Sequence, residues 1–224
     1  MFTHRLLNVA LRILFKICLR LEVVGRENIP AEGPVIYMIN HVSFLDPIVV
    51  GGVSPREVVI MSKIENLNLP VWGIFIKLYG CFAVRRGEVD LHATRYALRV
   101  LQDGKILLMA PEGTRSPTHQ LQPGHDGMAF LALRADAPIM PVAVTGGQHF
   151  GSNMKRLRPT PVKVVFGKSF RLRSKQGRVR RDSLHKMTEE TMYQLAAILP
   201  LAYRGVYSDL DSATERFLVF EDEG

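Results

Sequence analysis

The sequence has little cysteine and no long uninterrupted apolar run, and both absences narrow the class of protein. Only Cys18 and Cys81 occur among its 224 residues. Two cysteines are too few for a disulfide framework and are consistent with a reducing compartment. Hydrophobic residues make up 47% of the chain and charged residues 22%, which is typical of a globular protein. The length suffices for one large domain with a hydrophobic core.

The most apolar stretch lies at the N-terminus, but its charges exclude a simple transmembrane helix. Arg5, Arg12, Lys16 and Arg20 interrupt it, whereas a spanning helix needs ~20 apolar residues without such charges. A cleaved signal peptide is excluded as well, because no uninterrupted apolar core or small-residue cleavage site is present. At about 100° per residue the four charges fall within about 80° of arc. We therefore expect an amphipathic helix over residues 1–21 that lies in a membrane interface. A helix packed on its own domain is the alternative.

Basic charge dominates the rest of the chain. The net charge is +8. Residues 209–224 hold six acids and one arginine, a net of −5, which leaves +13 for residues 1–208. Such a surface favours polyanions, and its densest patches lie at residues 155–158 and 168–181. Zinc-finger spacing and RNA-binding aromatic signatures are absent from the sequence, so nucleic acid is the weaker candidate. A solvated basic face without a specific partner is the alternative.

Apolar runs and helical patterns alternate along the chain, which predicts an α/β fold with a sheet covered by helices. The sequence shows no internal repeat and no linker, so we expect one domain over residues 22–208. The acidic tail, residues 209–224, is a candidate for disorder. The strands are expected at residues 34–40, 56–63, 80–84, 106–110, 138–146 and 162–167, and helices at 90–105, 127–137 and 183–200.

A histidine and an aspartate follow the first predicted strand closely. His41 comes directly after "PVIYMIN", and Asp46 follows five residues later. Five helical residues turn the chain by about 500°, which would leave the two side chains about 140° apart on one helix. They meet only if His41 lies on the strand-to-helix turn and Asp46 at the helix start. A carboxylate there would fix the imidazole tautomer and leave the other nitrogen as a general base.

Structural explanations of the same residues stay open. Asp46 followed by Pro47 is a good helix-capping pair, and Ser43 with Asp46 resembles a capping box. His41 would then be an ordinary core histidine. Ser43 as a nucleophile is a weaker possibility, since no glycine-flanked elbow surrounds it.

Two further loops begin where predicted strands end, and ligands of such sheets bind beyond the carboxyl ends of strands. Arg85 and Arg86 follow the strand at residues 80–84, and paired guanidiniums bind phosphate well. The loop "PEGTRS" follows the strand at residues 106–110. Its glycine lets the backbone approach a ligand closely, and its threonine and arginine suit phosphate oxygens. Ordinary polar turns are the alternative at both places.

The motifs "NHVSFLD", "GCFAVRR", "PEGTRS" and "IMPVAV" together resemble the four sequence blocks of the glycerolipid acyltransferases, most closely the bacterial 1-acylglycerol-3-phosphate acyltransferases. The resemblance covers roughly residues 20–205. It implies a glycerol-phosphate acyltransferase-like mixed sheet covered by helices, with 22–208 as the acyltransferase domain. His41 matches the family's general base and Asp46 its orienting carboxylate. The resemblance also implies a phosphate site formed by Arg85, Arg86, Glu112, Gly113, Thr114 and Arg115. It implies that Phe82 and Pro141 bind the acyl chain.

The resemblance implies transfer of an acyl group from acyl-CoA or acyl-ACP to the free hydroxyl of 1-acyl-glycerol-3-phosphate, which gives phosphatidic acid. It implies no cofactor and no metal, since the thioester is already activated. The expected partners are a membrane lipid surface, a lysophospholipid and the acyl carrier, with no nucleic acid, and the expected location is the cytoplasmic face of the cell membrane, peripheral or monotopic. The alternatives are another acceptor (another lysophospholipid, glycerol 3-phosphate or a lyso-aminolipid) and a non-catalytic lipid-binding module.

Overall fold

The structure, a computed structural model, describes the chain except for residues 1–10, 12, 64–81, 85–89, 174–179 and 221–224. The described residues form a nine-stranded mixed sheet with the path β1-β7-β6-β2-β5-β3-β4, and β8 joins β6 to β9. Its strands are β1 (Leu19–Val24), β2 (Val35–Ile39), β3 (Val58–Lys63), β4 (Phe82–Val84), β5 (Ile106–Met109), β6 (Ile139–Thr145), β7 (Thr160–Phe166), β8 (Phe170–Leu172) and β9 (Leu218–Phe220).

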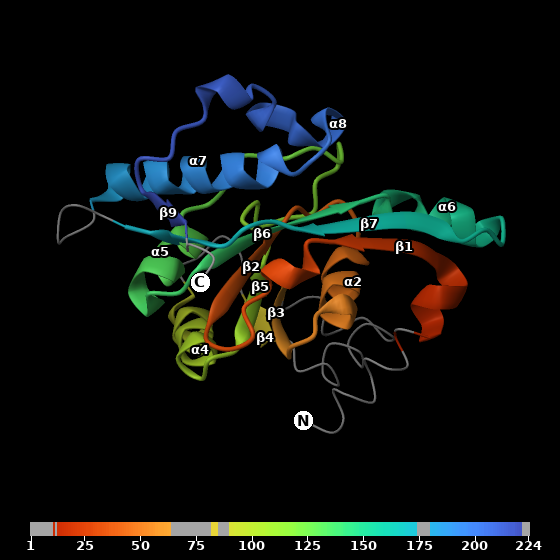
Figure 1. The fold of residues 1–224 in the computed structure, drawn as a ribbon, viewed down its shortest axis with the longest axis horizontal. Helices are drawn as coiled ribbons and strands as arrows, with labels where there is room; N and C mark the ends of the chain where they lie inside the picture. The colour runs from red at the N-terminus through yellow and green to blue at the C-terminus, as the bar shows by residue number, and fades with distance from the viewer. Residues whose placement is uncertain (1–10, 12, 64–81, 85–89, 174–179, 221–224) are drawn as a thin grey trace.

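Helices cover both faces of this sheet (Figure 1). One core cluster packs α4, α5 and α7 on one face, and the other cluster packs α2 and the helical residues before β1 on the opposite face. The remaining short helices connect strands or follow α7. The helices are α2 (Asp46–Val53), α4 (Leu91–Gln102), α5 (Gly127–Ala135), α6 (Phe150–Lys155), α7 (Arg181–Ala197) and α8 (Leu201–Arg204), with 3-10 turns η1 (Arg26–Asn28), η3 (Gly147–His149), η4 (Gly205–Tyr207) and η5 (Leu210–Ser212).

The predicted alternation of strands and helices is confirmed. Strand β2 is buried at all five positions, and its side chains alternate between the two core clusters, as a central strand covered on both faces requires. Helix α4 begins at an N-cap, where the Asp90 carboxylate accepts a hydrogen bond from the Ala93 N–H at 2.9 Å. It ends near Gly104, whose φ of 69° lies in the left-handed region.

The N-terminal segment departs from the expected helix over residues 1–21. Residues 11 and 13–18 are helical, but Leu19 begins β1, because β1 finds a parallel partner in β7 about 140 positions along the chain, with Leu19 beside Thr160. The described helical residues bury Leu11 and Phe15 in the core and expose Ile13, Leu14 and Ile17. None of the helices in the described ranges is long and apolar enough to cross a bilayer.

The acidic tail is ordered through Phe220, which corrects the expectation of disorder for that part. Strand β9 pairs antiparallel with β8. The carboxylate of Glu190, which is buried in α7, accepts hydrogen bonds from the Thr214 hydroxyl and from the backbone N–H groups of Arg216 and Phe217. Composition alone cannot foresee this, since the acceptor belongs to another element.

Replacing Glu190 by alanine is predicted to lower the free energy of unfolding by about 3 kcal/mol, because three donors lose a buried charged acceptor. Urea unfolding measures the loss, and limited proteolysis within residues 208–220 should become faster. The control is Asp211→Ala on the exposed turn η5, which should stay within about 0.5 kcal/mol of the parent chain. Equal stability of the Glu190 variant and the parent would contradict this account of the tail.

Candidate active site

The candidate site lies where parallel strands end. Strand β2 runs parallel to β5, β5 to β3, and β3 to β4, so their carboxyl ends share one edge of the sheet. The loops after β2 and β5 meet there, as predicted: the backbone N–H of Ser116 donates to the carbonyl oxygen of His41 at 2.8 Å. The remaining expected loop, after β4, carries Arg85 and Arg86, which lie outside the described residues.

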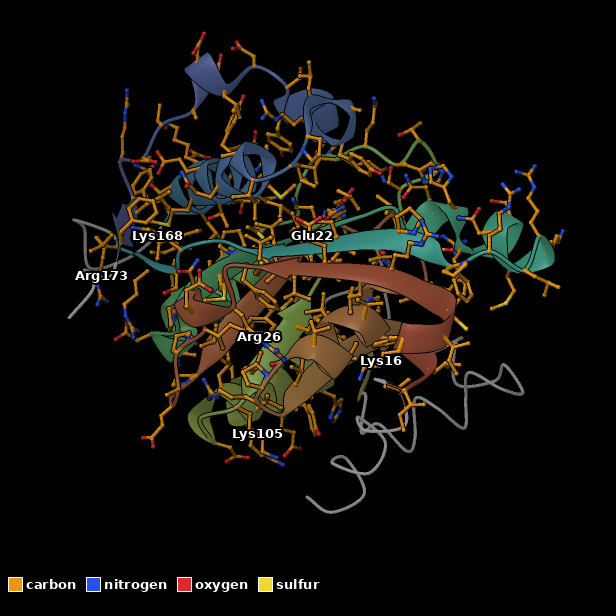
Figure 2. The ribbon with its side chains drawn as sticks, turned by 45° about the vertical axis from the view of Figure 1, so that its right-hand side comes forward. Lys16, Glu22, Arg26, Lys105, Lys168 and Arg173 are labelled. Carbon is orange, nitrogen blue, oxygen red and sulfur yellow. The ribbon has the colours of Figure 1, made fainter. Side chains whose placement is uncertain are left out.

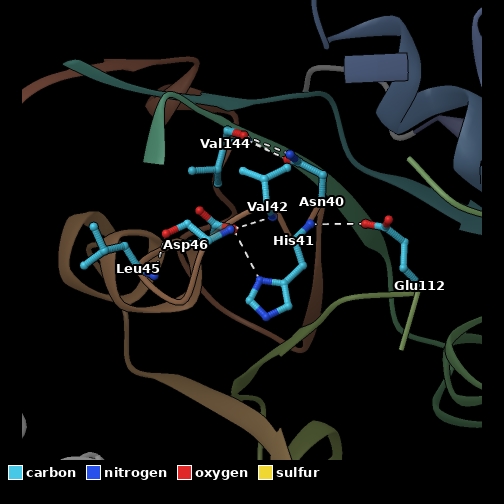
Figure 3. A network of polar contacts seen from close by, with 8 residues as sticks. Asn40, His41, Val42, Leu45, Asp46, Glu112 and Val144 are labelled. Carbon is cyan, nitrogen blue, oxygen red and sulfur yellow. Dashed lines mark hydrogen bonds and ion pairs between the residues drawn. The ribbon is translucent and has the colours of Figure 1, made fainter. Parts of the chain in front are cut away.

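His41 and Asp46 form the predicted pair. Asp46 Oδ2 lies 3.2 Å from His41 Nδ1 (Figure 3). The imidazole is 18% exposed, whereas the carboxyl group is completely buried. Because Asp46 accepts from Nδ1–H, the neutral ring is held as the tautomer whose Nε2 carries the free lone pair.

The same carboxylate oxygen also shapes the loop. Oδ2 accepts hydrogen bonds from the backbone N–H groups of Val42 at 2.7 Å and Ser43 at 2.6 Å. Asp46 therefore does not cap its own helix in the expected way, since Leu45 is the N-cap residue of α2 and Asp46 is the first helical residue. Its side chain turns back toward the strand because the N–H groups that follow His41 point at it.

Two opposing effects act on the acidity of Asp46. Burial raises the pKa of its carboxyl group, and the hydrogen bond and charge of His41 together with the backbone donors of Ser43 and Val42 lower it. The second oxygen, Oδ1, has no hydrogen-bond partner in the described part of the chain. Gly147 is in contact with it: a Cβ at this position would lie 2.9 Å from Oδ1 and 3.1 Å from Ser43 Cβ. The glycine leaves space for the buried carboxylate.

Glu112 is expected among the phosphate ligands, but in the structure its carboxylate contacts backbone N–H groups. Its side chain is 3% exposed, and its two oxygens accept the backbone N–H of His41 at 3.1 Å and that of Gln122 at 3.0 Å. Figure 3 shows the carboxylate reaching the His41 backbone from the loop after β5. A carboxylate would repel a phosphate, so we assign Glu112 to the positioning of His41.

Burial raises the pKa of Glu112 to about 7, although the backbone donors of Gln122 and His41 and the charge of His41 oppose the rise. The Glu112 carboxyl group is therefore partly protonated near neutral pH. Its protonation is linked to folding, because the unfolded chain would bind this proton only below about pH 4.5.

Within the "PEGTRS" motif of the loop after β5, Gly113 packs against a histidine, and only Thr114 and Arg115 face outward. Gly113 has a φ of 67°, and a Cβ there would lie 2.9 Å from the ring of His125, so only glycine fits without displacing the histidine. Thr114 and Arg115 are exposed. Within the described ranges neither of their side chains forms a hydrogen bond or an ion pair, and both remain available to a ligand.

A cavity of about 170 Å³ opens beside His41. Its walls are mostly apolar and come from the ends of β2, β3 and β5 and the start of α5, with Ile39, Met61, Leu108, Met109, Pro111 and Met128 among the lining residues. The site thus combines an oriented imidazole with an apolar space.

The two expected acyl-binding residues are Pro141 and Phe82. Pro141 lies inside β6 beside Gly167, and it is not part of the cavity lining. Phe82 belongs to β4, but its side chain lies outside the described part. Their roles stay predictions.

Sequence reasoning missed two residues that hold the site together. The side-chain amide of Asn40 donates to the carbonyl oxygen of Val144 at 2.8 Å and accepts from its N–H at 2.7 Å, which joins the end of β2 to β6. Gly147 is the second. The glycine pair at residues 146–147, at the end of the strand predicted for residues 138–146, was an available signal for a close backbone approach.

Fold and site together define a class of α/β protein with a histidine–aspartate pair at the carboxyl end of a mixed sheet. Residues 20–145, more than half of the chain, match the family model described as Acyltransferase. The chain therefore belongs to the acyltransferase family.

Relatives within this family share a printed name. A "1-acyl-sn-glycerol-3-phosphate acyltransferase" of Borreliella burgdorferi is 29% identical over 65% of this chain and 61% of its own length. One of Pseudomonas aeruginosa is 31% identical over 66% of this chain and 58% of its own length. The chain thus spans about three fifths of these relatives. The crystal structure of a 1-acyl-sn-glycerophosphate (LPA) acyltransferase, PlsC, from Thermotoga maritima has the same fold, with a TM-score of 0.63, 24% identity, and coverage of 84% of this chain and 76% of that one.

Replacing Glu112 by glutamine is predicted to change how stability depends on pH. A carboxyl group whose pKa is raised from 4.5 to about 7 on folding lowers the free energy of unfolding by about 3 kcal/mol as pH rises through that window. The glutamine variant lacks this loss, so its stability relative to the parent should rise by about 3 kcal/mol between pH 4.5 and pH 7.5. Urea unfolding across the window measures the difference. A constant difference at all pH values would contradict the assignment.

Proposed function

We propose that the chain is an O-acyltransferase that transfers an acyl group from acyl-CoA or acyl-ACP to the free hydroxyl of 1-acyl-glycerol-3-phosphate and gives phosphatidic acid. The observation that carries the proposal is the His41–Asp46 pair beside an apolar cavity, in a chain that belongs to the acyltransferase family. The names of the relatives support the choice of acceptor.

The oriented imidazole suits one chemical step. Nε2 of His41 takes the proton of the acceptor hydroxyl while the hydroxyl oxygen attacks the thioester carbonyl carbon. A tetrahedral intermediate forms and collapses, the carbon–sulfur bond breaks, and the imidazolium returns its proton to the departing thiolate. The thioester is already activated, so no acyl-enzyme is required. General-base assistance of this kind is worth ~10²–10⁴ in rate.

Asp46 assists this step through the ring. The completely buried carboxylate lies 3.2 Å from Nδ1, and its negative charge stabilises the imidazolium that forms when the hydroxyl loses its proton. It also keeps the Nδ1–H tautomer, which aims the basic nitrogen away from the carboxylate. Asp46 is therefore a positioning and electrostatic group that does not itself take the proton.

The phosphate of the acceptor fits the outward face of the loop after β5. Thr114 and Arg115 are exposed on the loop whose Glu112 and Ser116 hold the His41 backbone. A phosphate bound there would be fixed relative to the base through the protein backbone. We assign Arg85 and Arg86 to the same anion on the basis of the family motif.

The remaining parts of the proposal concern the donor and the membrane. CoA and acyl carrier protein are both anionic, and a chain with a net charge of +8 suits either. A lysophospholipid acceptor favours attachment to a membrane surface, and the donor chemistry favours the cytoplasmic face of the cell membrane. No metal or cofactor is needed by this mechanism.

Replacing His41 by alanine is predicted to lower turnover by at least about 10² while the fold is retained. The assay follows thiol release from palmitoyl-CoA with and without lysophosphatidate, and circular dichroism controls for folding. Release that requires both lysophosphatidate and His41 supports the proposal. Near-normal turnover in the variant would contradict the mechanism, and release without any acceptor would indicate a thioesterase.

A panel of acceptors tests the substrate class. Acyl transfer to lysophosphatidate is expected to exceed transfer to glycerol 3-phosphate, to lysophospholipids with larger head groups and to lyso-aminolipids. Preference for an acceptor without a phosphate monoester would overturn the choice of substrate. Vesicle binding with no transfer to any acceptor, from either donor, would favour the lipid-binding module.

Replacing Gly147 by alanine is predicted to lower kcat about tenfold, because the added methyl group would displace Asp46 and with it the imidazole. Gly151→Ala is a matched control, since a Cβ at that exposed position of α6 meets no atom within 4 Å. The pH profile of kcat should shift in the Gly147 variant only. Equal kcat and pH profile in the two variants would contradict the role of the close contact.

A further inference from the structure

The loop after α6 carries Leu157, the most exposed large apolar residue in the part of the chain that the structure describes. Leu157 is 91% exposed and Met154 is 44% exposed. Lys155, Arg156 and Arg158 surround them and are exposed as well. Within the part of the chain that the structure describes, no acidic side chain pairs with these three cations. We call residues 154–158 the α6 tip.

The α6 tip is closed by two backbone hydrogen bonds and presents Leu157 at a strained position. The N–H of Leu157 donates to the carbonyl oxygen of Met154, and that of Arg158 to the carbonyl oxygen of Asn153, both at 3.0 Å. These two bonds form a Schellman motif. Leu157 has the left-handed φ of 51° that this motif requires, a position usually held by glycine. The chain therefore holds a large apolar side chain in solvent where a smaller, less strained residue would close the same turn.

The register of the sheet places the tip on the edge that carries the candidate site. Strand β7 is antiparallel to β6, with Thr145 beside Lys163, and β6 is parallel to β2, with Ile39 beside Val142. The start of β7, and the tip before it, thus lie beyond the carboxyl end of β2, where His41 follows.

The tip is also joined to the site by packing. Phe150, the first residue of α6, makes an edge-on contact with Phe44 of the His41 loop, with ring centroids 5.9 Å apart. The turn η3, which immediately precedes α6, contains the Gly147 that contacts Asp46. A surface bound by the tip would therefore be held close to the base and its carboxylate.

A second apolar segment begins at the same edge. Leu19 of β1 pairs in parallel with Thr160 of β7, so the helical residues before β1 and the tip before β7 lie at one end of the sheet. This helix buries Leu11 and Phe15 and exposes Ile13, Leu14 and Ile17, the last at 67%. Figure 1 shows the helix and α6 at the same end of the ribbon, and Figure 2 shows Lys16 on that side.

We propose that the α6 tip is a membrane contact of its own, in which Leu157 and Met154 enter the interface of an anionic bilayer while Lys155, Arg156 and Arg158 bind lipid phosphates. Apolar side chains ringed by cations are the arrangement that binds such a surface. The edge of the sheet that carries the site would then face the lipid, together with the helical residues before β1. This proposal rests on the proposed function in one respect: an enzyme with a lipid substrate has to reach a membrane surface.

The decisive experiment measures binding of the full chain to sedimented vesicles made from equal parts of phosphatidylglycerol and phosphatidylcholine. The double variant Met154→Gln/Leu157→Gln should bind about tenfold more weakly than the parent. Val219→Thr, which makes a similar exposed replacement on β9, far from α6 in Figure 1, should bind like the parent. Unchanged binding of the double variant would overturn the proposal.

Charge-reversal variants distinguish a specific membrane contact of the α6 tip from attraction of the whole basic protein to an anionic membrane. Lys155→Glu/Arg158→Glu should weaken binding by at least about tenfold, since each basic residue near an anionic surface contributes to attachment. Arg181→Glu/Lys186→Glu changes the net charge equally at the exposed start of α7, which lies at the far end of the ribbon from α6. An equal loss in both variants would overturn the proposal.

Activity distinguishes this proposal from the proposed function. Both tip variants should keep parental turnover with a short-chain, water-soluble lysophosphatidate and lose it with the same acceptor embedded in vesicles. Loss of vesicle binding supports the tip even if the chain transfers no acyl group. Parental turnover on vesicle-embedded acceptor together with parental binding would overturn the tip and leave the acyltransferase proposal intact.

Discussion

The hydrogen bond between His41 and a completely buried Asp46 is the interaction on which the candidate site depends. An ionised carboxylate is costly to bury unless donors surround it, and here the donors come from His41 itself and from the two N–H groups that follow it. The loop therefore folds around the carboxylate, and the imidazole orientation follows from the same contacts. Neighbouring elements preserve this burial: Gly147 leaves space for the unpartnered oxygen.

A second buried carboxylate acts on the other side of the histidine. Glu112 accepts the peptide N–H of His41, and Ser116 donates to its carbonyl oxygen, so the loop after β5 clamps the residue through its backbone. This arrangement gives the motif "PEGTRS" two tasks. Its buried part holds the His41 backbone, and its exposed part, Thr114 and Arg115, is where we propose that the substrate phosphate binds. In the proposed mechanism, such a connection would hold the base and the phosphate at a fixed separation, which proximity catalysis needs.

Much of the fold was predictable because its signals are local. The buried run that forms β2 and the capped amphipathic pattern of α4 both appear in the sequence as expected. The meeting of His41 and Asp46 was predictable from spacing and strand ends. Strand β1 was not, since its alternating "LRLEVV" continues an apolar N-terminal segment, and the partner that makes it a strand is β7, far along the chain.

Two other features that the sequence does not reveal, the ordered tail and the contacts of Glu112, have the same origin, which is a partner far along the chain. The tail has the acidic composition of a disordered segment, yet the buried Glu190 collects its N–H groups. Glu112 stands among phosphate-binding residue types, yet the N–H groups it faces belong to His41 and Gln122. In both cases a carboxylate serves as a backbone acceptor, and only tertiary structure identifies the donor.

Nitrogen-15 NMR of the histidine rings tests the central claim most directly. The protein would be labelled in its seven histidines, and the His41 signals assigned by comparison with His41→Gln. The account predicts that the neutral His41 ring carries its proton on Nδ1 and leaves Nε2 unprotonated, and that Asp46→Asn removes this preference. A ring protonated on Nε2, or a tautomer unaffected by Asp46→Asn, would contradict the claim that Asp46 prepares His41 as the base.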